Sequence, residues 1–128
     1  MARYVDGFVI PVPKRNVPAY RRIAQKAGKV WLEHGALEVR ECVGDDLKIK
    51  GMVPFPRMAR ARAGETVFFS WIVYKSRAQR DRVNAKVMKD PRIMADMMDP
   101  KAMPFDVKRM VYGGFRVLVD QKSRSSRR

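Results

Sequence analysis

Apolar and polar positions alternate along the chain with two periods, and the switches between them predict six elements. A period of two, rich in β-branched and aromatic residues, predicts four strands, and apolar residues at three- and four-residue spacing predict two helices. The predicted elements span residues 4–12, 17–34, 36–43, 65–74, 77–89 and 108–120. The order β-α-β-β-α-β is typical of a ferredoxin-like α+β domain, which has a four-stranded antiparallel sheet and both helices on one face.

Local signals mark the ends of these elements. Asn16 and Ser76 stand where the N-caps of the two helices are expected, and Gly35 stands where the first helix needs a left-handed C-terminal cap. Asp90-Pro91 ends the second helix and begins a short helical turn through residue 98. Gly113-Gly114 predicts either a bulge or a close approach in the last strand.

The third predicted strand is apolar on both of its faces. Four residues face one way and three face the other: Val67, Phe69, Trp71 and Val73 against Phe68, Ile72 and Tyr74. A strand in a sheet with one solvated face would alternate with polar residues. Because two helices cover only one face, we expect a second copy of the chain to cover the other, so that two sheets stack as a homodimeric α+β barrel.

Composition limits the class of protein. The chain has 128 residues, 46% of them hydrophobic, which favours one folded domain at residues 1–120 followed by a basic disordered tail at 121–128. One cysteine excludes an intrachain disulfide, and one histidine with one cysteine cannot build an ordinary structural zinc site. Without an export signal or an apolar run of spanning length, we expect a cytoplasmic protein with no membrane partner.

Eight motifs in a fixed order run through residues 4–120. They are Tyr-Val-Asp-Gly-Phe-Val (4–9), Glu-His-Gly-Ala-Leu-Glu (33–38), Glu-Cys-Val-Gly-Asp-Asp (41–46), Phe-Ser-Trp-Ile-Val-Tyr-Lys-Ser-Arg (69–77), Val-Met-Lys-Asp-Pro-Arg (87–92), Met-Asp-Pro (98–100), Met-Pro-Phe-Asp (103–106) and Lys-Arg-Met-Val-Tyr-Gly-Gly-Phe (108–115). Together they resemble the YbaA-like family of bacterial proteins of unknown function. That family is similar in fold to the dimeric α+β barrels, which include antibiotic-biosynthesis monooxygenases. The resemblance therefore implies a fold and a dimer, and a monooxygenase-like activity by fold analogy only.

Three ionisable side chains are candidates for acid–base catalysis: Asp6, His34 and Glu38. Asp6 interrupts the otherwise apolar first strand, which is central in the expected sheet, so its carboxylate is predicted to be buried and to need a partner. His34 ends the first helix, where it either stabilises the helix end or acts as a base beside a pocket. Each candidate also fits a structural role, as an ion pair or a cap.

Three further residues are predicted to line a ligand pocket between sheet and helices: Glu41, Trp71 and Tyr112. Glu41 lies on an apolar strand face, which indicates a buried partner, and the two aromatic residues are expected as pocket walls. Cys42 is expected to be an inert thiol, and the methionines between residues 88 and 110 are expected to fill apolar space. We expect no metal and no cofactor.

The net charge of +15 keeps a second class of function open. The primary hypothesis is a homodimer that binds or transforms a small organic molecule in its pocket. One alternative is a nucleic-acid-associated protein that uses the tail and a basic stripe of Arg82, Lys86 and Lys89 on the second helix, although no recognition motif accompanies them. The other alternative is a structural or stress-associated homodimer without a ligand. Whether the protein is an enzyme stays open at this point.

Overall fold

The structure, a computed structural model, describes residues 2–123. Its helices and strands are β1 (Tyr4–Pro13), α1 (Val17–Glu33), β2 (Glu38–Val43), α2 (Phe55–Met58), β3 (Glu65–Tyr74), α3 (Arg77–Met88), α4 (Pro91–Met97) and β4 (Val111–Arg116). The four strands form one antiparallel sheet in the order β2-β3-β1-β4. This confirms the ferredoxin-like α+β fold. Most of the tail predicted at 121–128 lies outside the described residues.

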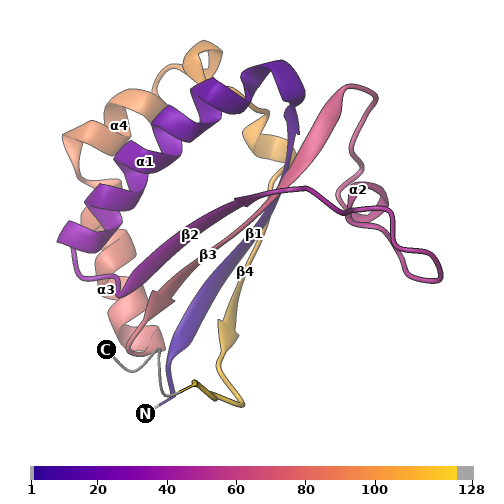
Figure 1. The fold of residues 1–128 in the computed structure, drawn as a ribbon. Coiled ribbons are helices and arrows are strands. Elements are labelled where there is room, and N and C mark those ends of the chain that lie inside the picture. The colour runs from indigo at the N-terminus through magenta and orange to yellow at the C-terminus, as the bar shows by residue number, and fades with distance from the viewer. Residues whose placement is uncertain (1, 124–128) are drawn as a thin grey trace.

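All three long helical segments lie on the same side of the sheet. Figure 1 shows α1, α3 and α4 along one face, with α2 apart from them on a loop that projects beyond the sheet. Two clusters of buried residues fill the space between the layers: Val30, Ala36, Ile72, Tyr74, Val83, Val87 and Ile93, and then Ile10, Val12, Tyr20 and Phe68. Each such apolar side chain contributes about 1.5–3 kcal/mol on burial, so the helix-covered face holds the main core.

The helix ends follow the sequence signals with one exception. Ser76 Oγ accepts a hydrogen bond from the Gln79 backbone N at 3.1 Å, and Gly35 has a φ of +120° just after α1, as predicted. Asn16 stands at the N-cap of α1 but makes no capping bond. Its side chain instead donates to the carbonyl oxygen of Pro104 at 2.9 Å, because that loop lies against the start of the helix.

β4 is shorter than predicted and contains no bulge. Its pairing with β1 runs without interruption through Gly113 and Gly114 and ends at Arg116, opposite Tyr4. Gly114 serves the other predicted purpose, a close approach. A Cβ on Gly114 would lie 2.5 Å from the Tyr4 hydroxyl oxygen, so a side chain there would displace the Tyr4 ring. Residues 117–120 are apolar in part but lie outside the strand.

The second face of the sheet carries none of the three longer helices α1, α3 and α4 (Figure 1). We call it the open face, and the strand register assigns to it Val5, Gly7, Glu38, Arg40, Cys42, Phe69, Trp71, Val73, Val111, Gly113 and Phe115. The α2 segment covers one end of this face, where Ala59 packs with Val9 and Val67. The rest is uncovered: Phe69 is 45% exposed and Phe115 is 63% exposed. The two-faced apolar pattern of β3 therefore corresponds to one packed face and one exposed face.

No helix among the described residues is long and apolar enough to cross a membrane.

Candidate functional site

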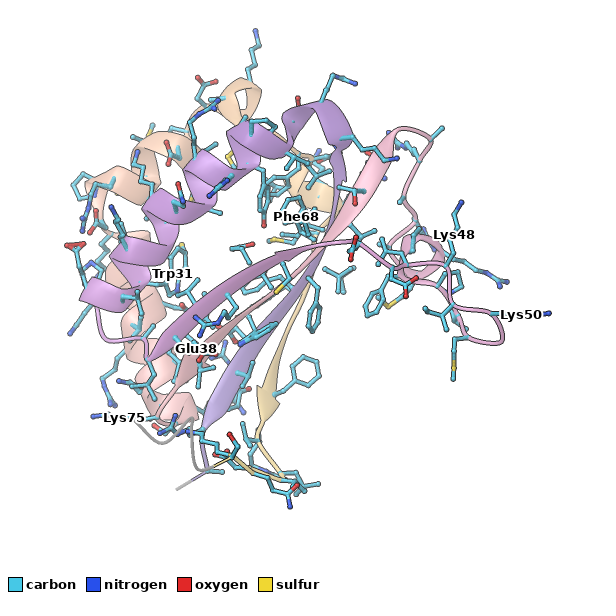
Figure 2. The ribbon with its side chains drawn as sticks, viewed as in Figure 1. Trp31, Glu38, Lys48, Lys50, Phe68 and Lys75 are labelled. Atoms are coloured by element: carbon cyan, nitrogen blue, oxygen red, sulfur yellow. The ribbon has the colours of Figure 1, made fainter. Side chains whose placement is uncertain are left out.

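A groove of about 1070 Å³ lies between the helix layer and the sheet. One wall comes from α1, through Ile23, Ala24, Ala27 and Trp31. Four methionines add flexible apolar surface: Met88, Met97, Met103 and Met110. Figure 2 shows Trp31 and Phe68 in the space between α1 and the sheet. A mostly apolar cleft of this size is the usual form of a small-molecule site.

The strand register places two rows of residues on the floor of the groove. The first row crosses all four strands as Glu41, Ser70, Phe8 and Tyr112. The second row runs as Val39, Ile72, Asp6 and Gly114. Two carboxylates therefore face the groove in adjacent rows, Glu41 from the edge strand β2 and Asp6 from the central strand β1. They are two strands apart, which is about 10 Å at the usual strand spacing.

Asp6 is 1% exposed and lacks a full set of partners. Its Oδ2 accepts a long hydrogen bond of 3.4 Å from Asn84 Nδ2. Its Oδ1 lies 3.8 Å from Arg80 Nε and makes no hydrogen bond within residues 2–123. The remaining Arg80 donors are directed to the hydroxyl oxygens of Tyr112, at 3.0 Å, and Tyr4, at 3.2 Å. A buried carboxylate with an unused lone pair is costly, which marks this position as one that a ligand or water can complete.

Asn84 joins the helix layer to this carboxylate. Its Oδ1 accepts hydrogen bonds from Trp31 Nε1 at 3.0 Å and from the Tyr74 hydroxyl at 3.2 Å. Burial, with the Asp6 charge nearby, raises the pKa of Tyr74, and the same two causes raise the pKa of Tyr112. Both phenols therefore stay protonated at neutral pH and remain available as hydrogen-bond donors.

Glu41 forms the second polar point of the groove. The Tyr20 hydroxyl donates to Glu41 Oε1 at 2.7 Å, and the Tyr20 ring lies 4.0 Å from the Phe68 ring between their centroids. Partial burial raises the pKa of Glu41, although the hydrogen bonds from Tyr20 and Ser70 oppose that shift. Burial, followed by the Glu41 charge, raises the pKa of Tyr20. The pair is a carboxylate and a phenol in contact, with the carboxylate open to the groove.

Comparison with known proteins identifies the family. The family model described as "Protein of unknown function (DUF1428)" matches residues 3–107. The chain belongs to this family. The uncharacterized protein YbaA of Escherichia coli K12 is 43% identical over 119 residues, which cover 93% of this chain and 99% of that protein. A YbaA protein of Shigella flexneri matches to the same extent. The YbaA-like resemblance of the eight motifs is thereby confirmed.

Solved structures similar to this DUF1428 protein share its fold at low sequence identity. A candidate antibiotic biosynthesis monooxygenase from Nitrosomonas europaea has a TM-score of 0.60 at 12% identity and covers 91% of each chain. A dimeric ferredoxin-like protein from an uncultured marine organism has a TM-score of 0.59 at 12% identity, covering 96% of this chain and 100% of the other. An uncharacterized NIPSNAP domain protein from Burkholderia xenovorans has a TM-score of 0.58 at 13% identity, covering 94% of this chain and 99% of the other. These similarities establish the fold alone.

The structure separates the three catalytic candidates. Asp6 lines the groove, as does Glu41 of the predicted pocket residues, together with Tyr112. Glu38 lies on the open face, where its Oε2 accepts from Trp71 Nε1 at 2.9 Å and its Oε1 is 3.6 Å from Arg40. Trp71 therefore lies on the open face too, and neither residue borders the groove.

His34 lies at the end of α1, outside the lining of the groove. Its Nε2 is 2.9 Å from Asp90 Oδ2, and the same oxygen lies 2.8 Å from Arg92 Nη2. The hydrogen bonds from Arg92 and then from His34 hold the pKa of Asp90 far below its usual range. Through these bonds the histidine joins α1 to the N-cap of α4. Its candidate role in catalysis stays a prediction.

The basic residues and the cysteine singled out in the sequence do not contribute to the groove. Arg82 and Lys86 are exposed on α3 and Lys89 is exposed at its C-cap, so the basic stripe of the nucleic-acid alternative lies on the surface. Cys42 is a free thiol. Within residues 2–123, no group of three or more His, Cys, Asp or Glu side chains comes together as a metal site.

Sequence reasoning missed three residues that shape the site: Tyr20, Arg80 and Asn84. Arg80 and Asn84 are four residues apart on α3, so they share the helix face that carries the buried Val83 and Val87. Two polar side chains on an apolar helix face were the available signal. Their opposition to Asp6 was not readable from the sequence because it depends on how α3 crosses the sheet.

Proposed function

We propose that this protein is a homodimer that binds a small organic molecule in the groove between sheet and helices. The observation that carries the proposal is the groove itself: about 1070 Å³ of mostly apolar space with a buried carboxylate, Asp6, that lacks a hydrogen bond at Oδ1. Apolar walls supply affinity, and a few convergent polar groups supply orientation. Asp6, Asn84 and Tyr112 are such a group at one point, and Tyr20 with Glu41 form another.

The dimer is proposed from the open face. Phe69 and Phe115 expose aromatic surface beside the half-buried Trp71, and contiguous apolar patches of this kind mark contact sites. A second copy that offers the same face would form an isologous contact and bury both. The dimeric ferredoxin-like protein with a TM-score of 0.59 supports a dimer. The groove lies on the opposite side of the sheet and stays accessible in such a dimer.

Should the bound molecule be transformed, Asp6 is the acid–base candidate. We expect Asp6→Asn to abolish a ligand-dependent activity while the dimer stays intact, because the amide keeps the size of the side chain and loses its basicity. The measurement is product formation together with the mass of the variant in solution. If Asp6→Asn unfolds instead, Asp6 is a structural residue and the catalytic assignment fails.

Native mass spectrometry of the purified protein tests the groove directly. We expect a bound small molecule or, after its removal, saturable uptake of small apolar compounds at one site per protomer. Ala27→Leu narrows the groove from α1 and should reduce uptake, whereas Ala85→Leu adds the same bulk to an exposed position of α3 and should not. Equal uptake by both variants would place the ligand elsewhere, and uptake by neither the variants nor the parent would refute the site.

A further inference from the structure

The groove carries the opposite charge from the protein as a whole. The chain has 28 Lys and Arg against 13 Asp and Glu. Around the groove, the charged side chains among the described residues are Asp6, Glu41, Asp96, Asp106 and Lys108. Charges interact more strongly in a partly desolvated cleft than in water, so this excess of carboxylates favours a cation over an anion as the occupant.

Three of the four carboxylates already have partners. Asp96 lies 3.4 Å from Lys26 Nζ, and Asp106, which caps the 3-10 turn that follows it, also interacts with the charge of Arg109. Asp6 faces Arg80 at 3.8 Å, a guanidinium that it shares with Asp81 at 3.2 Å, so a cation lies beside Asp6 even though the hydrogen bond is not made. None of these three is left as an uncompensated negative charge in the groove.

Glu41 is different because its contacts are neutral. It is held by the Tyr20 hydroxyl at 2.7 Å and faces Ser70 across the β2–β3 pair. It forms no ion pair within residues 2–123, and its side chain remains more than one-third exposed, toward the groove. Partial burial raises the pKa of Glu41, in keeping with a carboxylate whose contacts are neutral hydroxyl groups. A ligand that brings a positive charge would supply what the protein does not.

We propose that the groove selects an organic cation, in which a protonated amine pairs with Glu41 and an apolar body lies along the methionine-lined wall. The inference rests on the ligand groove proposed above and adds the chemical class of its occupant. Met88, Met97 and Met110 provide an adaptable apolar surface for the body of the ligand. Tyr20 keeps Glu41 Oε1 in place while the second oxygen accepts the ammonium group.

Three eight-carbon probes test this choice, because octylamine, octanol and octanoate share a chain and differ in the charge of the head group. At about pH 8 the amine is protonated and carboxylates are ionised. Calorimetric titration of the whole protein should show octylamine binding about tenfold tighter than octanol, with octanoate weakest. This comparison uses the unaltered protein, so it does not depend on whether a variant folds.

Variants then locate the charge that the amine meets. Glu41→Gln keeps an acceptor for Tyr20 and removes the negative charge, so the advantage of octylamine over octanol should vanish while octanol binding stays the same. Asp96→Asn is the matched control, since it removes a groove carboxylate that Lys26 already pairs. It should leave the preference for the amine intact.

Each outcome decides the cation inference, and one of them also decides the groove. Equal affinity for octylamine and octanol would overturn the cation inference and leave the groove standing as a ligand site. An amine preference that survives in Glu41→Gln would overturn Glu41 as the partner of the cation. Failure of all three probes to bind would overturn both the groove and its proposed occupant.

Discussion

The two faces of the sheet differ in where their carboxylates find hydrogen-bond and ion-pair partners. On the groove face, Asp6 is buried in a central strand and reached by Asn84 and Arg80 from α3. On the open face, Glu38 sits on the edge strand and pairs with its neighbours Arg40 and Trp71. The first arrangement brings in groups from another layer, and the second uses only residues of the same sheet.

This difference shows which face of a one-sheet domain can hold polar groups that remain available to a ligand. A carboxylate on the groove face has partners whose positions depend on helix packing, and its pairing is left incomplete. A carboxylate at an exposed edge finds its hydrogen-bond partners on neighbouring strands and is screened by water, so its ion pair contributes little to stability. The open face therefore suits contact with a second chain, and the groove face suits a ligand.

The largest difference between the two faces should appear in stability. Ile72 is buried under the helices and Val73, its neighbour in β3, points to the open face. We expect Ile72→Ala to cost about 3 kcal/mol and Val73→Ala to cost less than about 1 kcal/mol in the monomer. Urea unfolding at low protein concentration measures both. Equal costs would mean that the open face is packed as tightly as the groove face.

A charge on the open face should break the proposed dimer. Phe115→Glu would place a carboxylate in a buried contact, so the dissociation constant should rise about thirtyfold, or about 2 kcal/mol. Sedimentation analysis measures the change. Met98→Glu is the control, because Met98 is 80% exposed and follows α4 in the helix layer. A dimer that is unaffected by Phe115→Glu, or an unaltered protein that is monomeric, would refute the open-face contact.

Acid should remove the stabilising ion pair between Arg109 and Glu65, the first residue of β3. Arg109 binds Glu65 through two bonds, of 2.7 and 2.8 Å, and this lowers the pKa of Glu65 to about 2. A lowered pKa in the folded state means that the stabilisation is full above the ordinary value of 4.5 and is lost as the pH falls toward 2. Glu65→Gln should therefore cost about 2 kcal/mol near neutral pH.

That cost should shrink as the pH falls below the ordinary range of the glutamate. Stability curves of the parent and the Glu65→Gln variant, measured between neutral pH and about pH 2, should converge at the acid end. A difference that stays constant with pH would show that the bond, rather than the charge, carries the stabilisation.

The same substitution at Glu41 should change folding stability in the opposite direction. The pKa of Glu41 is raised in the folded protein, so ionisation of this group opposes folding at pH values above its ordinary range. Glu41→Gln should be neutral to slightly stabilising near neutral pH, and the effect should fade in acid. Thermal unfolding of the parent, Glu41→Gln and Glu65→Gln in one buffer series compares the two signs. If Glu41→Gln instead lowers stability at neutral pH, the conclusion that the Glu41 charge lacks a compensating cation is wrong.

The smallest expected effect is optical. Trp31 borders the groove and Trp71 lies on the open face. With Trp71→Phe, the remaining emission from Trp31 should respond to groove ligands and not to protein concentration. With Trp31→Phe, the emission from Trp71 should instead become protected from quenchers as the protein is concentrated. A reversed response would mean that the two faces have been assigned the wrong roles.

The burial of Asp6 was predictable because the element order places β1 in the centre of the sheet. The same reasoning did not place Glu38, an acid–base candidate like Asp6, or Trp71, an expected pocket wall, because both lie on the opposite face from Asp6. Trp71 stands opposite Gly7, and Asp6 stands opposite Ile72, so the two belong to different faces. A shift of one residue in register reverses the face of every side chain, and register is set by strand pairing rather than by the residue itself.

The end of β4 shows a second limit of sequence reasoning. The apolar run to residue 120 favours a longer strand, yet pairing stops at Arg116 because its partner β1 begins at Tyr4. One further bond, from the Val117 backbone N to the Arg3 carbonyl oxygen at 3.0 Å, closes the pair. A strand extends only as far as a neighbour supplies donors and acceptors, and this neighbour is more than 100 residues away in the chain.

The sequence by itself determined the element order, the ferredoxin-like topology, the family and the two-faced apolar character of β3, because periodicity and local caps act over a few residues. Only the tertiary structure decided that Arg80, Asn84 and Asp6 meet, that Tyr20 holds Glu41, and that Glu38 and Trp71 lie apart from them. These contacts depend on how α1 and α3 cross the sheet. The packing of a helix on a sheet reflects the shape of whole surfaces, which no local pattern encodes.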